Sequence, residues 1–269
     1  MAQHKSVWLE GRERQKQLDK ADNGLETAYF GYQRVESTKK TQRVIQHFNS
    51  IARQYDFMNT LLSFGIHHIW KRTAVRMLDP EPGSRILDVC GGTGDLAILA
   101  ARAIGPSGRV VIYDINRAMM QAGSHKVVGK PHENQVQYVQ GNAESIAFPD
   151  NHFDGAMVGF GIRNVTHMAK GFEEMYRILR PGGKMMCLEF SKPTNPVFCG
   201  LYDFYSFRIM PLLGQMIAGS RTAYTHLPES IRSFPLPDEL ADILKHMGFN
   251  EVRYRRLTNG IAVIHTAVK

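Results

Sequence analysis

The stretch Arg85-Ile-Leu-Asp-Val-Cys-Gly-Gly-Thr-Gly-Asp95 decides the fold of this 269-residue chain. Residues 85–89 are a short apolar run typical of a buried strand, and the glycines after it predict a tight turn. An Ala-rich helical segment follows at 96–104, and a second strand at 109–113 ends at Asp114. A strand, a glycine turn, a helix and a second strand in this order predict a parallel βαβ unit.

The same alternation of strand-like and helix-like segments continues to the C-terminus. Further elements are predicted as strands at 136–139, 155–158 and 184–189, helices at 117–128, 169–179 and 237–247, and a hairpin of 252–257 with 261–267. We therefore predict an α/β fold with a mostly parallel seven-stranded sheet, a C-terminal antiparallel hairpin and helices on both faces.

Three segments lie outside this pattern. Residues 1–40 interleave basic and acidic side chains, which indicates a solvated polar arm. Residues 41–77 carry apolar side chains at three- and four-residue spacings, so we predict a helix within a substrate-side extension at 41–80. The main domain is expected at 81–269, with an aromatic-rich helical insertion at about 196–231.

Composition restricts the class of protein. Hydrophobic residues make up 43% and charged residues 22%, which is typical of soluble globular chains and argues against a disordered or fibrous one. Lys and Arg exceed Asp and Glu by 33 − 25 = 8, which favours an anionic partner. Without an 18-residue uncharged run or a secretory signal, we expect a cytoplasmic protein. The three cysteines match neither a disulfide framework nor a zinc site, and no metal is expected.

Polar residues after the first three strands indicate a nucleoside site. In open parallel sheets, ligands bind at the carboxyl ends of the strands, where glycines let the backbone approach closely. Asp114 lies 114 − 93 = 21 positions after Thr93, and its carboxylate can accept both hydroxyl hydrogens of a ribose. Asn142 and Ala143 follow the third strand, where an amide and a backbone N–H can read an adenine edge.

Two classes of cofactor fit the glycine turn. The segment from Gly92 to Ala97 also has the loose GxGxxA form of a dinucleotide site, so an NAD-dependent reductase stays open as an alternative. A pyrophosphate needs the helix N-terminus, however, and Asp95 would repel it. The sulfonium of S-adenosylmethionine (SAM) suits Asp88 and Asp95 better. A nucleic-acid-binding module has only the net charge in its favour, so no specific nucleic-acid partner is expected.

Four separated blocks resemble one family. They are Tyr55-Asp-x-Met-Asn59-x-x-Leu62-Ser63-x-x-x-His67-x-x-Trp70, residues 160–166, residues 177–191 and residues 202–207. Together they resemble class I SAM-dependent methyltransferases, and much more closely the ubiquinone/menaquinone biosynthesis C-methyltransferases (the UbiE family). The resemblance implies a Rossmann-like class I methyltransferase fold with SAM as cofactor. The implied substrate is a lipophilic polyprenyl quinol, either demethylmenaquinol or a 2-methoxy-6-polyprenyl-1,4-benzoquinol.

The turn and the resemblance together select the candidate cofactor-binding residues. These are Asp88, Gly91, Gly92, Thr93, Gly94, Asp114, Asn142, Ala143 and Gly159. Relatives often have Ser or Ala at position 159, so Gly159 retains only a backbone contact there. His226 stands where an aromatic residue is common. A SAM-dependent methyltransferase for another small aromatic or sterol-like acceptor is the nearest alternative.

Methylation of a quinol ring needs an electron-rich carbon and an acceptor for the phenol proton, because loss of that proton makes the ortho carbon nucleophilic. A neighbouring cation would stabilise the phenolate strongly. Arg163 is the candidate for that cation, polarising a water that takes the proton. Asn164 and Tyr55 are expected to orient the ring oxygens, and His67 is an alternative base.

The polyprenyl tail of such a substrate belongs in a bilayer. Residues 196–218 are apolar and aromatic but are interrupted by Asp203, Arg208 and Pro211, which is typical of a lid or an interfacial surface and not of a membrane span. With the net charge of +8, this segment predicts peripheral attachment to an anionic membrane surface. A homodimer and a larger quinone-biosynthesis complex both stay open as further partners.

Overall fold

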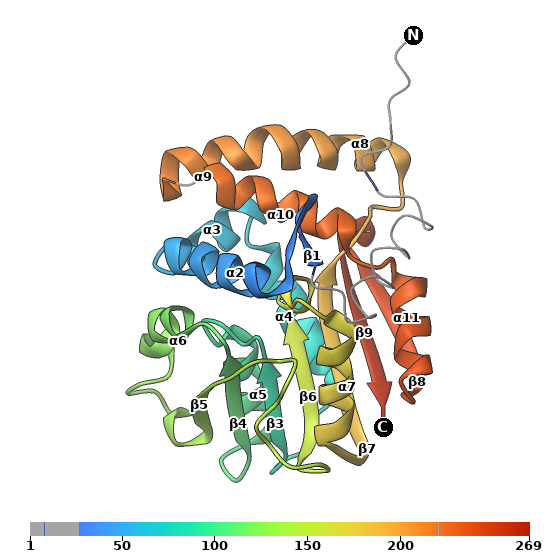
Figure 1. The fold of residues 1–269 in the computed structure, drawn as a ribbon. Helices are drawn as coiled ribbons and strands as arrows, with labels where there is room; N and C mark the ends of the chain where they lie inside the picture. Colours follow the sequence, from blue (N-terminus) through green and yellow to red (C-terminus); the bar gives the residue numbers. More distant parts are fainter. Residues whose placement is uncertain (1–7, 9–26, 220) are drawn as a thin grey trace.

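A seven-stranded mixed sheet forms the centre of the computed structural model, which describes Trp8 and residues 27–219 and 221–269 (Figure 1). The strand order is β5-β4-β3-β6-β7-β9-β8, and only the last two strands in that order run antiparallel to their neighbours. The strands are β3 (Arg85–Val89), β4 (Arg109–Asp114), β5 (Val136–Gln140), β6 (Phe153–Gly159), β7 (Leu179–Phe190), β8 (Asn250–Leu257) and β9 (Ala262–Val268). The predicted fold class and the closing hairpin are confirmed.

Alternating side chains of the interior strand β3 enter two hydrophobic cores, one on each face of the sheet. Ile86 belongs to one core, and Leu87 and Val89 belong to the other. Since both faces are covered by helices, the strand reads as a nearly continuous apolar run. The helices with residues in these cores include α4 and α5 on the first face and α7 and α11 on the second. Their bounds are α4 (Ile66–Leu78), α5 (Asp95–Ile104), α7 (Met168–Ile178) and α11 (Pro237–His246).

The helix predicted at 117–128 is shorter than expected. Helix α6 (Arg117–Gly123) ends at Gly123, and a 3₁₀ turn η1 (Ser124–Lys126) continues the chain. Gly123 packs directly on the glycine turn, because a Cβ added there would lie 2.2 Å from the backbone oxygen of Thr93. This contact positions η1 beside the turn.

The single helix predicted over residues 41–77 is wrong. The segment contains α2 (Ser37–Ile51), α3 (Tyr55–Leu62) and most of α4. Phe64 and Gly65 interrupt it with φ of 51° and 75°, a left-handed backbone that no α-helix contains. The apolar periodicity continues on both sides of this break, so the pattern alone could not reveal it. In Figure 1, α2 and α3 lie beyond the carboxyl ends of the parallel strands.

Residues 27–40 of the expected polar arm form strands and the first turn of a helix. A hairpin of β1 (Thr27–Phe30) and β2 (Gln33–Glu36) leads directly into α2. Apart from Trp8, the remainder of that expected arm lies outside the described residues. The insertion comprises α8 (Pro196–Phe204), a π-helical turn η4 (Tyr205–Ile209), α9 (Met210–Ala218) and α10 (Arg221–Ser233), which lie at the top of Figure 1 above α2 and α3. None of the described helices has the length and apolar character that crossing a bilayer requires.

We expect Gly123→Ala to destabilise the protein by about 1–3 kcal/mol, because the new methyl group would overlap the backbone of Thr93. The matched control is Gly200→Ala on the exposed side of α8, where nothing lies within 4 Å of the added Cβ. That control should be neutral or stabilising by up to about 1 kcal/mol. Urea denaturation of both variants measures the difference, and equal stabilities would contradict the proposed packing.

Candidate active site

The glycine turn between β3 and α5 adopts a backbone that favours very small residues. Cys90, Gly92 and Gly94 have φ of 55°, 52° and 82°, all in the left-handed region. A Cβ on Gly91 would lie 2.9 Å from the backbone oxygen of Asp88. The sequence Cys-Gly-Gly-Thr-Gly therefore forms a tight loop at the carboxyl end of β3.

Asp114 is joined to this loop by its carboxylate. Its Oδ2 accepts a hydrogen bond from the Gly92 N–H at 2.8 Å, and its Oδ1 accepts one from the Asn116 N–H at 2.7 Å. Burial raises the pKa of Asp114 to about 6, so the group is still mostly ionised at neutral pH. A carboxylate has about four lone-pair sites, so both oxygens retain capacity for another donor.

A cleft runs beside Asp114 along the ends of the strands. Asn142, Ala143 and Gly159 line it together with Asp114, as the sequence predicts. Helix α2 covers the cleft with side chains such as Val44. A Cβ on Gly159 would lie 2.4 Å from Leu96 Cδ1, so a larger residue there would require the Leu96 side chain to move.

A smaller pocket at the glycine turn continues this cleft. Asp88, Gly91 and Thr93 line it, and Cys90, Gly92 and Gly159 border both spaces. Gly94 borders neither of them. A Cβ there would lie 2.7 Å from Ile112 Cδ1, so Gly94 acts through backbone packing and not through a ligand contact.

Asp88 is buried as a neutral acid. Its Oδ2 accepts a hydrogen bond from the Ala97 N–H at 3.0 Å, whereas Oδ1 has no partner among the described residues. Burial raises the pKa of Asp88 to about 8, because the apolar surroundings penalise the charged form. Asp88 therefore carries a proton at neutral pH, and its unpaired atom is available to a ligand.

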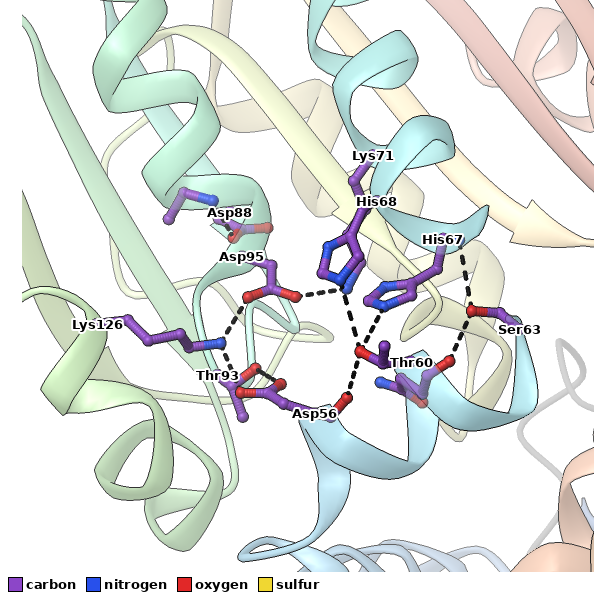
Figure 2. Close-up of polar contacts among 12 residues, drawn as sticks. Asp56, Thr60, Ser63, His67, His68, Lys71, Asp88, Thr93, Asp95 and Lys126 are labelled. Atoms are coloured by element: carbon purple, nitrogen blue, oxygen red, sulfur yellow. Dashed lines mark hydrogen bonds and ion pairs between the residues drawn. The ribbon is translucent and has the colours of Figure 1, made fainter. Parts of the chain in front are cut away.

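Asp95 lies between two lysines (Figure 2). Lys71 Nζ lies 2.7 Å from its Oδ2, and Lys126 Nζ lies 2.5 Å from its Oδ1. Burial alone would raise the pKa of Asp95, but the two ammonium groups outweigh it and hold this pKa well below its usual range. Asp95 is thus not the bare anion that the sequence argument assumed, because its charge is already neutralised.

The same network ties α3 to the glycine turn. Asp56 Oδ1 accepts a hydrogen bond from Thr93 Oγ1 at 2.7 Å, and its Oδ2 lies 2.7 Å from Lys126 Nζ (Figure 2). Sequence reasoning missed Lys71 and Lys126 and assigned no role to Asp56. Asp56 lies in the first family-like block, which was a usable signal, but nothing in the spacing indicates Lys126.

An apolar cavity of about 340 Å³ adjoins the cleft beneath α8 and α10. Most of its wall is aliphatic or aromatic, and its lining includes Ile51, Leu62, Ile66, Trp70, Phe190 and Tyr202. Trp70 Nε1 donates to Thr258 Oγ1 at 2.9 Å, so this residue also joins α4 to the turn before β9.

The cleft and the apolar cavity meet at Asn164. Asn164 borders both spaces, as do Tyr55 and Phe160. The Asn164 Nδ2 is buried and has no partner among the described residues. Burial raises the pKa of the Tyr55 phenol, so its hydroxyl is protonated at neutral pH. The structure therefore brings these two predicted residues together at one junction.

Arg163 reaches the apolar cavity as half of a buried ion pair. Its Nη1 lies 2.9 Å from Glu189 Oε2, and the two side chains are 7% and 2% exposed. Nη1 also donates to the backbone oxygen of Phe160, and Nε donates to Ser230 Oγ at 3.4 Å. Burial raises the pKa of Glu189, although Arg163 opposes that shift. Glu189 lies in the family-like block at 177–191, but nothing in the sequence pattern indicates that it pairs with Arg163.

His67 lines the apolar cavity from α4. Its Nε2 lies 3.1 Å from Thr60 Oγ1, and its Nδ1 is buried with no partner among the described residues. Burial lowers the pKa of His67 to about 4, so the imidazole is neutral at physiological pH. Within the described part of the chain, no cluster of His, Cys, Asp and Glu has a geometry that could hold a metal ion.

Comparison with known proteins places this geometry in a family. The profile of the ubiE/COQ5 methyltransferase family matches residues 36–269. The chain belongs to this family. One relative, the ubiquinone/menaquinone biosynthesis C-methyltransferase UbiE of Pseudomonas putida strain GB-1, is 42% identical over 250 residues, which cover 93% of this chain and 98% of the relative.

Solved structures support the fold of this ubiE/COQ5 family member. A SAM-dependent methyltransferase from Aquifex aeolicus has a TM-score of 0.54 at 17% identity and covers 74% of this chain and 88% of that one. One from Thermotoga maritima has a TM-score of 0.58 at 18% identity and covers 83% and 98%. The class I methyltransferase fold is confirmed, and family membership confirms the predicted enzyme class and SAM as its cofactor.

We expect Asp88→Asn to remove a pH dependence from stability. The folded state holds the Asp88 proton up to a pKa of about 8, whereas the unfolded chain releases it near 4. Wild-type stability should therefore fall by up to about 1.4 kcal/mol per pH unit as pH rises through that window. Between pH 5 and pH 7 the variant should lose about 2–3 kcal/mol less than the wild type. Urea unfolding at both pH values measures this, and parallel losses would refute a protonated Asp88.

Proposed function

We propose that this chain methylates a ring carbon of a polyprenyl quinol with SAM, in menaquinone or ubiquinone biosynthesis. The acceptor would be demethylmenaquinol or a 2-methoxy-6-polyprenyl-1,4-benzoquinol. The observation that carries the proposal is the junction at Asn164, where a cleft lined by Asp114 and Asn142 meets an apolar cavity. A prenyl quinol has a polar ring, which suits the polar groups at this junction, and a long apolar chain, which suits the apolar cavity. The Pseudomonas putida relative is named as a ubiquinone/menaquinone biosynthesis C-methyltransferase, which supports the same pathway and reaction.

The residues of the cleft fit SAM. The Asp114 carboxylate has lone pairs left for the ribose hydroxyls, and Asn142 with Ala143 would hold the adenine edge. The loop residues Gly91 to Thr93 and the unpaired Oδ1 of Asp88 would hold the amino-acid end of the cofactor. When bound, SAM supplies a methyl group activated by its sulfonium sulfur.

Arg163 would stabilise the phenolate of the substrate. Phenols ionise near pKa ~10 in water, and a cation in a water-poor cavity favours the ionised form strongly. Glu189 holds the guanidinium in place and keeps the resting pair neutral, so a neutral ring enters without meeting a net charge. Arginine stays protonated in proteins, so the proton passes to a water polarised by Arg163.

Tyr55 and Asn164 would orient the ring oxygens, since both border the junction and Asn164 Nδ2 has an unused donor among the described residues. His67 borders the same cavity, but its pKa of about 4 makes it a weak proton acceptor. Its role is therefore secondary to that of Arg163. The apolar lining excludes water from the rest of the cavity, which strengthens each of these polar contacts.

The helical insertion would place the enzyme on an anionic membrane surface. Exposed apolar side chains recur along one side of α8, η4 and α9. They are Val197, Leu201, Phe204, Leu212 and Met216. Arg208, also exposed, lies between Phe204 and Leu212, which continues the three- or four-residue spacing. Other residues of α8, such as Tyr202, line the apolar cavity, and Leu201 borders it as well. A prenyl tail could therefore pass from lipid into the cavity beside Leu201.

The purified enzyme should convert a demethylated short-chain prenyl quinol into a product one methyl group heavier, with S-adenosylhomocysteine (SAH) as co-product. The double variant Arg163→Met with Glu189→Gln removes both charges together, which avoids an unpaired buried carboxylate. We expect kcat to fall by roughly 10²–10⁴-fold while SAH binding is retained. Mass spectrometry measures the product, and calorimetry measures SAH binding. An unchanged kcat would exclude the role given to Arg163, and no methylated quinol from the wild type would exclude the function.

Replacing Phe204 and Met216 by Ser should weaken binding to anionic vesicles by about tenfold or more, because each side chain exposes apolar area that lipid would cover. Val128→Ser is the matched control, since Val128 is 60% exposed but lies just after η1, away from the insertion. Cosedimentation with anionic phosphatidylglycerol and with neutral phosphatidylcholine vesicles measures the apolar contribution and the electrostatic contribution separately. Equal recovery with the two lipids would contradict attraction to anionic lipid.

A further inference from the structure

His226 on α10 borders the apolar cavity. It also borders a second cavity, whose lining includes Lys40, Arg163 and Glu173. Its side chain is 7% exposed. The Nδ1 atom is buried with no partner among the described residues, and Nε2 makes no hydrogen bond to those residues either. Buried polar groups are ordinarily hydrogen-bonded, so an imidazole that makes no hydrogen bond to a described residue and lines two cavities has a nitrogen available to a ligand.

The imidazole is held in one orientation by the N-terminal hairpin. Phe30 of β1 stacks on the ring with centroids 3.8 Å apart and an interplanar angle of 12°. A Cβ on Gly31 would lie only 3.2 Å from Nδ1, and Gly31 has φ of 59°. Since Nδ1 faces the Gly31 backbone, Nε2 is the nitrogen that remains for a ligand.

The surroundings also keep the ring uncharged. Burial lowers the pKa of His226 to about 3, and the neighbouring His47 and Arg163 add to that shift. His47 lies edge-on to it at 5.2 Å, lines the same apolar cavity, and has its own pKa lowered by burial to about 4. A neutral imidazole carries one N–H donor and one lone pair, so it is suited to bind a neutral hydroxyl and not to act as a base.

We propose that His226 is a positioning residue that hydrogen-bonds the second hydroxyl of the quinol, the one not held by Arg163. This inference rests on the proposed quinol methylation. A hydroxyl both donates and accepts, so it satisfies Nε2 in either tautomer, whereas the carbonyl of an oxidised quinone only accepts. The contact would therefore orient the ring between Arg163 and α10 and favour the reduced form of the substrate.

The test compares two ligands in the presence of SAH: a short-chain demethylated quinol and its monomethyl ether at the second hydroxyl. Calorimetry on the wild type should give an ether Kd roughly 3- to 30-fold weaker than the quinol Kd. In His226→Phe the quinol should weaken by a similar factor while the ether changes less than twofold. His226→Gln keeps a donor and an acceptor, so it should restore most of the quinol affinity. In turnover, His226→Phe should raise KM and change kcat less than threefold.

The matched control is His265→Gln. His265 is also buried, with a pKa lowered to about 4, but its Nε2 contacts the backbone oxygen of Pro237, and His265 does not line the apolar cavity. This variant should leave both Kd values unchanged. Equal affinity of the wild type for quinol and ether, or an equal loss of both ligands in His226→Phe, would overturn the role of His226. A wild type that neither binds nor methylates the quinol would instead overturn the proposed function itself.

Discussion

The hydrogen bond from the Gly92 N–H to the Asp114 carboxylate holds the site together. Strands β3 and β4 pair in parallel with Val89 opposite Tyr113, so the loop after one strand and the acid after the other reach the same sheet edge. The bond at 2.8 Å then fixes the left-handed loop against the acid. Because the second carboxylate oxygen binds the Asn116 N–H, the acid is held rigidly while both oxygens keep lone pairs for a ligand.

Buried charge around this centre is neutralised within the protein. Asp95 lies between two ammonium groups, and Arg163 is paired with Glu189. Asp88 avoids the desolvation cost by retaining its proton. The cleft and cavity therefore present hydrogen-bonding groups without a large net charge, which suits a neutral lipophilic ring. The sequence argument treated Asp88 and Asp95 as anions that favour a sulfonium, whereas in the structure Asp88 is protonated and Asp95 is paired with two lysines.

Helices outside the sheet build the second half of the site. Helix α2 covers the cleft, and α3 is tied to the glycine turn through Asp56. Residues of the insertion line the apolar cavity. Helices α8 and α9 have one apolar side facing the cavity and another facing outward. An exposed apolar side of this kind is typical of a surface that another apolar surface covers, and the proposed membrane attachment would cover it.

The sequence by itself determined the sheet, the glycine turn and Asp114, because strand periodicity and backbone sterics act over a few neighbouring residues. The family-like blocks added the junction residues and the cofactor. Only the tertiary structure decided which charges meet. Lys126 reaches Asp95 from 31 positions away, and Glu189 reaches Arg163 from 26, so no local spacing records either pair. The same holds for the stacking of Phe30 on His226, since packing joins segments whose separation along the chain carries no signal.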